Sequence, residues 1–127
     1  MALIHMTYLS QALLRTVELQ VILPVDKFMA AGNDRESKDF KTLYLLHGLL
    51  GSSMDWISGT CIQRWAEERE LAVVMPSGEN SFYFDHVLPN NAYGRFIGQE
   101  LPAMMRKTFP LSEKREDTFI GGLSMGG

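Results

Sequence analysis

The chain has 127 residues, of which 46% are hydrophobic and 10% aromatic, and these values predict one globular domain with a buried core. Twelve lysines and arginines against fifteen aspartates and glutamates give a net charge of −3 with both signs scattered, which argues against a nucleic-acid partner. No targeting segment or bilayer-length apolar run occurs, so we expect no membrane partner and a cytoplasmic location. The single cysteine, Cys61, excludes an intrachain disulfide framework and is expected to be a packed thiol.

The first third of the chain predicts two strands of different kinds. Residues 13–23 alternate apolar and polar side chains up to Pro24, which is typical of a half-buried antiparallel strand. A polar, turn-rich connection follows over 25–41, so an edge hairpin is the simplest arrangement. Residues 42–46 are apolar almost throughout, as expected for a strand that is covered on both faces of a parallel sheet.

A crossover helix and a second buried strand come next. Ser58 or Thr60 is placed to cap the helix, and Pro76 stops the apolar strand 71–75. Strand, helix and strand together form one βαβ unit, which predicts a parallel sheet. The buried face of the helix is expected to carry Ile62, Trp65, Ala66 and Arg69.

The remaining elements alternate in the same way. Residues 77–91 form a polar loop whose Phe82 and Phe84 either line an acyl pocket or pin the loop down. Residues 92–109 have a helical apolar pattern that Pro102 is expected to kink or divide. Residues 117–121 predict a further buried strand, which gives the order ββαβαβ.

The last residues carry a serine between two glycines at the G-x-S-x-G spacing, formed by Gly122, Ser124 and Gly126 directly after the strand. In a nucleophile elbow the chain turns so sharply from strand to helix that the serine is strained and exposed, and side chains at the flanking positions would collide. A glycine-rich loop or helix cap with an incidental serine is the alternative interpretation of this motif. The strand propensity before the turn favours the elbow.

His47 and Gly48 follow strand 42–46 and open a loop of small residues at the carboxyl edge of the sheet, where open α/β sheets bind ligands. Acyl transfer needs an oxyanion hole, made from the N–H after the nucleophile and one from a loop after an earlier strand. Those donors are the backbone N–H groups of Met125 and Leu49. The sequence therefore predicts a nucleophile, Ser124, with both oxyanion donors.

A serine hydroxyl also needs a histidine base and a carboxylate that orients the histidine. In this architecture both partners follow the serine along the chain, and neither follows Ser124 here. His5 and His86 are poor substitutes, and His47 is expected to shape its loop rather than to act as the base. We predict that the chain lacks the residues that would activate its nucleophile.

The stretches YLLHGLLGSSMDW, LAVVMPSGENSFY, ELPAMM and TFIGGLSMGG resemble the esterase D and S-formylglutathione hydrolase group of α/β-hydrolases. Within it they are most similar to the small tributyrin or acetyl esterases. The resemblance implies a partial α/β-hydrolase fold, a mostly parallel sheet with an antiparallel N-terminal edge and crossover helices. It also implies hydrolysis of short acyl esters through an acyl-enzyme on Ser124, with the Leu49 and Met125 amides as oxyanion donors and without metal or cofactor. S-formylglutathione hydrolases tend to have another residue at the position of His47, which favours the simple esterases.

Three hypotheses follow for the chain as a whole. In the first, residues 1–127 are the N-terminal part of a single α/β-hydrolase domain, ending at the nucleophile elbow, and this part alone shows little or no turnover. In the second, the chain is a catalytically dead remnant or a binding module. The third keeps the fold and the acyl-enzyme but makes the protein an S-formylglutathione thioesterase or an acyltransferase. The partner is a small acyl ester in the first case, and a homo-oligomer is left open.

Overall fold

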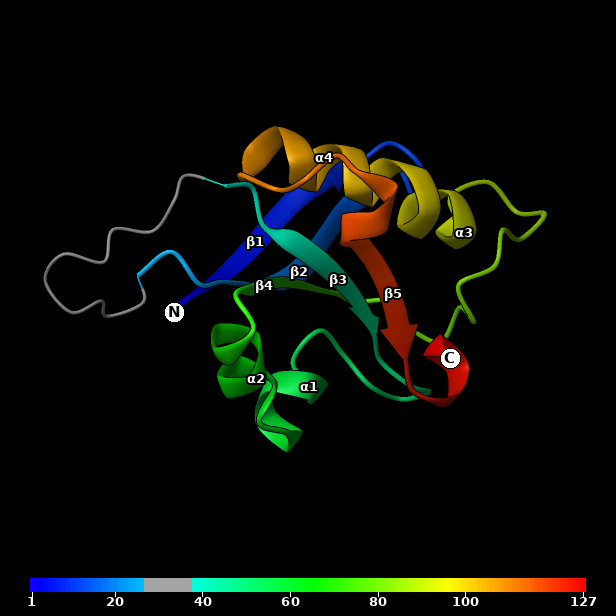
Figure 1. Ribbon diagram of the computed structural model, residues 1–127. Coiled ribbons are helices and arrows are strands. Elements are labelled where there is room, and N and C mark those ends of the chain that lie inside the picture. The colour runs from blue at the N-terminus through cyan, green and yellow to red at the C-terminus, as the bar shows by residue number, and fades with distance from the viewer. Residues whose placement is uncertain (27–37) are drawn as a thin grey trace, which may run out of the picture.

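The computed structural model describes residues 1–26 and 38–127, and these form one five-stranded sheet with helices on both faces (Figure 1). The strand order is β1-β2-β4-β3-β5. β3 is parallel to both β4 and β5, whereas β2 is antiparallel to both β1 and β4. The expected parallel sheet with an antiparallel N-terminal edge is confirmed. The strands are β1 (Ala2–Ser10), β2 (Arg15–Leu23), β3 (Lys41–Leu46), β4 (Leu71–Pro76) and β5 (Thr118–Gly122).

The N-terminal hairpin differs from the prediction, because its first strand was not recognised. β1 pairs with β2 from Ala2 opposite Leu23 to Ser10 opposite Arg15, so β2 lies inside the sheet and is not an edge strand. β1 does alternate in burial, but leucines on its exposed side conceal the period of two in the sequence. Much of the predicted connection over 25–41 lies outside the described residues.

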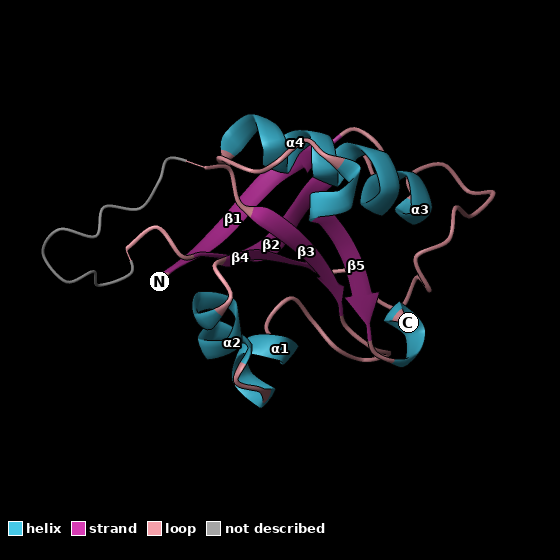
Figure 2. Cartoon of the chain, in the orientation of Figure 1, coloured by secondary structure: helices cyan, strands magenta, loops and turns pink. Residues whose placement is uncertain are grey.

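Two helical layers cover the sheet, one on each face (Figure 2). On one face lie α1 (Asp55–Gly59) and α2 (Ile62–Glu68), which form the crossover from β3 to β4. On the other face lie α3 (Tyr93–Arg95), the π-helical segment η1 (Phe96–Glu100) and α4 (Leu101–Thr108). Each layer closes its own hydrophobic cluster against the strands, and the larger cluster lies under α4. The predicted two-sided cover of residues 42–46 is confirmed.

The predicted helix over 92–109 is confirmed as a run of helical residues that changes its geometry before Pro102. The N–H of Leu101 bonds to the carbonyl of Phe96, a five-residue spacing that widens the turn immediately before the proline. Such a π segment accommodates a residue that cannot donate to the carbonyl four positions earlier. Phe96, Leu101 and Met105 are fully buried, so the apolar side of the helix faces the sheet as predicted.

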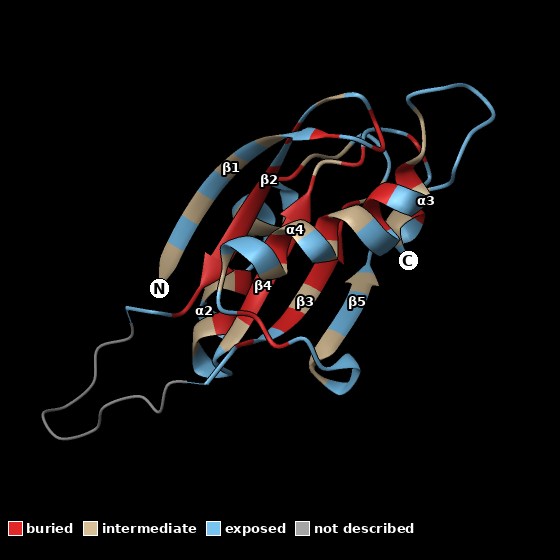
Figure 3. Cartoon of the chain, turned by 90° about the horizontal axis from the view of Figure 1, so that it is seen from above, coloured by how far each residue is buried: buried red, intermediate tan, exposed pale blue. Residues whose placement is uncertain are grey.

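β5 is exposed, which corrects the prediction of a buried strand. Phe119 and Ile120 expose 45% and 66% of their surface, and Figure 3 shows β5 as the pale edge of a sheet whose centre is buried. β5 has only one neighbour, β3, and no helix in the described part of the chain lies over its outer half. The short turns η2 (Arg115–Asp117) and η3 (Ser124–Gly126) flank it.

Three smaller expectations for the crossover are also wrong. The predicted buried face is wrong for Trp65, which exposes 48% of its surface, and for Arg69, which is exposed just after α2, because α2 buries only Ile62 and Ala66. Cys61 is exposed where the chain enters α2, so it is not a packed thiol. The predicted cap is also shifted: Cys61, and not Ser58 or Thr60, is the N-cap of α2, although the Thr60 hydroxyl accepts the Ile62 N–H at 3.1 Å. Among the described residues, every helix is too short or too polar to cross a lipid bilayer.

Candidate active site

The G-x-S-x-G motif forms a sharp turn directly after β5. Ser124 has a φ of 54°, in the left-handed region that side chains rarely adopt. A Cβ on Gly122 would lie 2.2 Å from the carbonyl oxygen of Gly126, and one on Gly126 would lie 2.7 Å from the carbonyl oxygen of Leu46. The backbone is therefore too close at both positions for any residue but glycine, as the elbow interpretation requires. The Leu123 N–H donates to the same Leu46 oxygen at 3.2 Å and anchors the turn to β3.

His47 is fully buried at the start of the loop that follows β3, with both ring nitrogens occupied. Its Nε2 lies 2.9 Å from the Gly78 N–H, and its Nδ1 lies 2.7 Å from the Gly48 carbonyl oxygen. Because the Gly78 N–H can only donate, Nε2 accepts, and the proton sits on Nδ1 and is donated to Gly48. This arrangement fits a residue that shapes the loop and leaves no nitrogen free to accept a proton from Ser124.

The loop after β3 runs directly against the elbow. A Cβ on Gly48 would lie 3.3 Å from the Leu123 carbonyl oxygen and 3.7 Å from the Ser124 Cβ. Within the described ranges the N–H of Leu49 donates no hydrogen bond. Met125 is buried, and its N–H belongs to the first turn of η3, where helical amides have no partner within the helix. The fold thus brings all the sequence-predicted site residues to one place at the carboxyl edge of the sheet.

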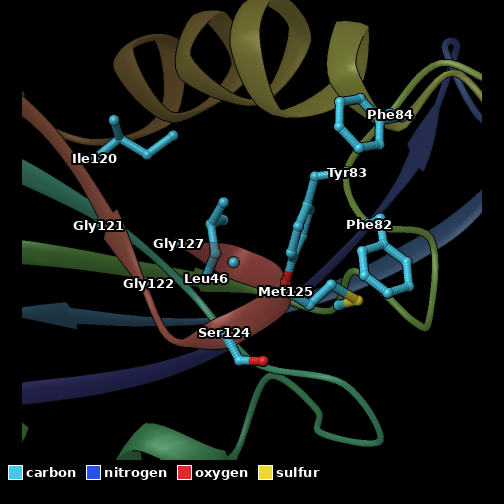
Figure 4. Close-up of a pocket in the computed structure, with 11 residues that line it drawn as sticks. Leu46, Phe82, Tyr83, Phe84, Ile120, Gly121, Gly122, Ser124, Met125 and Gly127 are labelled. Atoms are coloured by element: carbon cyan, nitrogen blue, oxygen red, sulfur yellow. The ribbon is translucent and has the colours of Figure 1, made fainter.

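Figure 4 shows which way the serine points. The Ser124 side chain is directed away from Ile120 and toward the loop that follows β3. The hydroxyl therefore lies on the side of the elbow that faces this loop. An acyl carbonyl attacked from this hydroxyl would develop its negative charge near that loop.

An open hollow of about 700 Å³ lies beside the elbow, and Ser124 and Met125 are among the residues that line it. Phe82 and Phe84 line it but remain largely exposed, so neither pins the loop into the core. Ile120 faces the hollow from β5 and pairs with Tyr44, whose side chain belongs to the cluster under α4. We interpret the hollow as an uncovered part of the α4 face of β5, and not as the space into which the serine hydroxyl points.

The segment after β4 contributes contacts that the sequence did not predict. The Leu50 N–H donates to the Asn80 side-chain oxygen at 2.9 Å, and the Tyr83 hydroxyl donates to the His47 carbonyl oxygen at 3.1 Å. The ring of Tyr83 also packs edge-on against the ring of His47. Burial raises the pKa of Tyr83 to about 12, so its hydroxyl stays protonated and donates throughout the neutral range. The only signal in the sequence was a cluster of small, polar and aromatic residues after a buried strand.

The histidines of the chain do not form a hydrogen bond to the candidate nucleophile. Of the three histidines, all of which lie in the described part of the chain, none is hydrogen-bonded to Ser124. His5 lies on β1 and bonds to Gln20 of β2, and the other three strands separate β1 from β5. His86 is exposed on its loop and contacts the carbonyl oxygen of Ser81. Within the described residues, Ser124 therefore has no histidine bonded to it that could accept its proton.

Known proteins are similar to this chain in both sequence and fold. The Esterase family model, described as "Putative esterase", matches residues 10–127. An acetyl esterase of Caldicellulosiruptor saccharolyticus is 44% identical over the whole chain, which spans 48% of that protein. The substrate-bound fluorophosphonate-binding serine hydrolase F of Staphylococcus aureus superposes with a TM-score of 0.83 at 37% identity, over 98% of this chain and 48% of that one. An S-formylglutathione hydrolase of the same organism gives 0.81 at 36% identity with the same coverage.

The chain therefore spans about half the length of these relatives. The five-stranded sheet, the two helical layers and the elbow described above all lie within the part that matches them. Its strand order, its G-x-S-x-G turn and its match to the family agree with one another. The chain belongs to the Esterase family and has part of the α/β-hydrolase fold.

Proposed function

We propose that the protein is a serine carboxylesterase that hydrolyses short-chain acyl esters through an acyl-enzyme on Ser124. The observation that carries the proposal is the strained Ser124, held between two backbone contacts that only glycine allows and directed toward the Leu49 loop. Strained backbone persists where the surrounding structure forces it, and it is common at active sites. The name and 44% identity of the acetyl esterase relative support a short acyl group.

In the proposed reaction the Ser124 oxygen attacks the ester carbonyl carbon and the alcohol leaves, so that an acyl-serine forms. Water then attacks the same carbon and releases the acid. In both steps the charge on the carbonyl oxygen is stabilised by the N–H groups of Leu49 and Met125, and the loss of one such donor typically costs about 3 kcal/mol. The chemistry uses no metal or cofactor.

The proton of Ser124 needs an acceptor, and His47 is already engaged on both nitrogens. We therefore propose that residues 1–127 are the N-terminal part of one α/β-hydrolase domain and that a later Asp and His act as orienter and base. The coverage of about half of each relative supports this arrangement. On its own the 127-residue chain is expected to show little or no turnover.

A thioester substrate is the second candidate, because one structural relative at 36% identity is an S-formylglutathione hydrolase. The acyl-enzyme step is the same for an ester and a thioester, so the residues of this chain serve both. Parallel assays with p-nitrophenyl acetate and S-formylglutathione separate the two. A kcat/KM that is higher for the thioester would replace the carboxylesterase proposal with this one.

The decisive experiment compares the protein purified from its natural host, called the host-made protein below, with the 127-residue chain. Both are assayed with p-nitrophenyl acetate, butyrate and octanoate, and both are treated with a fluorophosphonate probe followed by peptide mass spectrometry. We expect the host-made protein to prefer the shorter esters and to be labelled at Ser124. Ser124→Ala should abolish both results, and Ser58→Ala, on an exposed turn of α1, should leave them unchanged. Hydrolysis that survives Ser124→Ala would refute the proposal.

A further inference from the structure

Three hydrogen bonds join the loop that follows β3 to a single segment after β4, residues 78–83, which we call the clamp segment. The Gly78 N–H donates to the ring of His47 and the Tyr83 hydroxyl donates to its carbonyl oxygen, at 2.9 and 3.1 Å. The Leu50 N–H donates to the Asn80 side-chain oxygen at 2.9 Å. These bonds hold the residues two positions before and one position after Leu49.

The clamp segment is itself held in a constrained form. Ser81 bridges it, because its hydroxyl donates to the Gly78 carbonyl oxygen at 2.7 Å and accepts the Tyr83 N–H at 3.1 Å. Glu79, Phe82 and Tyr83 have φ values of 49°, 54° and 56°, so three residues that are not glycine adopt the left-handed conformation. Such a backbone costs energy at each residue and forms only where other contacts require it. The segment is therefore a fixed support and not a loose loop.

The loop that it supports has little packing of its own. Leu49 exposes 50% of its surface and Leu50 exposes 84%, so burial contributes little to holding them in place. Leu50 also has a φ of 65°, which a free loop would avoid. The Gly51 N–H closes the turn around Leu49 by donating to the Gly48 carbonyl oxygen at 3.1 Å, and the hydrogen bonds to the clamp segment hold this turn in place beside the elbow.

We propose that Tyr83 and Asn80 are positioning residues that hold the Leu49 N–H against the reacting carbonyl at Ser124. This inference rests on the proposed esterase function, and it assigns a role to two side chains that do not touch the reacting atoms. Tyr83 is the stronger support, because its hydroxyl is partly buried and donates within the protein interior, whereas Asn80 is exposed and competes with water.

The test uses Tyr83→Phe and Asn80→Ala in the host-made protein, because each change removes one of the supporting hydrogen bonds. The matched control is Tyr44→Phe, since the Tyr44 hydroxyl on β3 is buried without a hydrogen-bond partner in the described structure. We expect kcat for p-nitrophenyl acetate to fall about tenfold in Tyr83→Phe and a few-fold in Asn80→Ala, because small displacements of catalytic groups are costly. KM should stay near the wild-type value, and the control should match the wild type.

Amide hydrogen exchange supplies a readout that does not depend on activity. The Leu50 amide should exchange faster in Asn80→Ala, and the Gly78 amide faster in Tyr83→Phe, because His47 loses one of its restraints. If these amides exchange at wild-type rates in both variants, the clamp segment does not restrain the loop and the proposal is refuted. Faster exchange with an unchanged kcat would overturn the positioning role. If the wild-type protein neither hydrolyses esters nor is labelled at Ser124, the proposed function has failed, and the exchange rates still decide whether the clamp exists.

Discussion

Gly78→Ala is the sharpest single test of the structure around the site. Gly78 is buried where β4 ends, and a Cβ there would lie 2.1 Å from Cε1 and 2.5 Å from Cζ of the Tyr83 ring. Neither distance is compatible with a real contact, so the ring must move. A moved ring loses the hydrogen bond from its hydroxyl to the carbonyl oxygen of His47.

The size of the effect follows from three contributions. Forcing an extra methyl group into a packed site typically costs about 1–3 kcal/mol. The lost hydrogen bond adds about 1 kcal/mol, and the lower chain entropy of alanine in the unfolded state returns about 0.4–1 kcal/mol. We therefore expect a net loss of about 2 kcal/mol in the free energy of unfolding.

Urea unfolding of the chain, followed by the fluorescence of Trp56 and Trp65, measures this loss, with an unchanged slope as the sign of a simple stability change. The matched control is Gly98→Ala on η1, where a Cβ meets nothing within 4 Å, and we expect it to stabilise the chain by about 0.5–1 kcal/mol. In a Tyr83→Ala background the cost of Gly78→Ala should disappear, because the clash has been removed. An equal cost in both backgrounds would refute the reasoning.

Three further predictions concern stability and association. Leu101→Ala removes a fully buried side chain between α4 and the sheet and should lower the free energy of unfolding, measured by thermal unfolding, by about 2–5 kcal/mol. A loss no larger than that caused by Val87→Ala, at an exposed position, would contradict this packing. The Ser112 hydroxyl donates a hydrogen bond to the Asp117 carboxylate, and Lys41 lies nearby, so the pKa of Asp117 is lowered below its usual value of 3.8. The ionised carboxylate therefore stabilises the folded chain above pH 3.8, and this stabilisation is lost as the pH falls through the pKa that Asp117 has in the folded state. Asp117→Asn should accordingly be destabilising near neutral pH and indistinguishable from wild type in strong acid, and an equal deficit at both would be the contrary result. Ile120 is exposed on an edge strand, so we expect the chain to self-associate, which sedimentation should detect and Ile120→Lys should reduce. A chain that stays monomeric at high concentration would contradict this expectation.

Much of the fold could be predicted because its elements leave local patterns in the sequence. Continuous apolar runs identify β3 and β4, and the helical period identifies the layer that contains α4. The exposure of β5 could not be predicted in this way. Thr118–Gly122 is as apolar as a buried strand, and its exposure depends on how many neighbours cover it, which no local pattern records.

The candidate site divides along the same line. Ser124 and its two glycines were recognised because the turn itself demands them within five residues. The clamp segment was not recognised, because Asn80 and Leu50 are 30 positions apart and bond through one side chain and one amide. A contact of that kind has no period and no fixed spacing, so only the folded structure brings it into view.

One strand connects the two halves of the site. The carbonyl oxygen of Leu46, the last residue of β3, accepts the Leu123 N–H of the elbow and leaves no space for a side chain on Gly126. The next residue is His47, which begins the loop that carries the Leu49 amide. The position of Ser124 relative to the Leu49 N–H, the proposed oxyanion donor, therefore depends on the end of β3 as well as on the clamp segment. A change that moves the end of β3 should displace both together, whereas a change in the clamp segment should displace the amide alone.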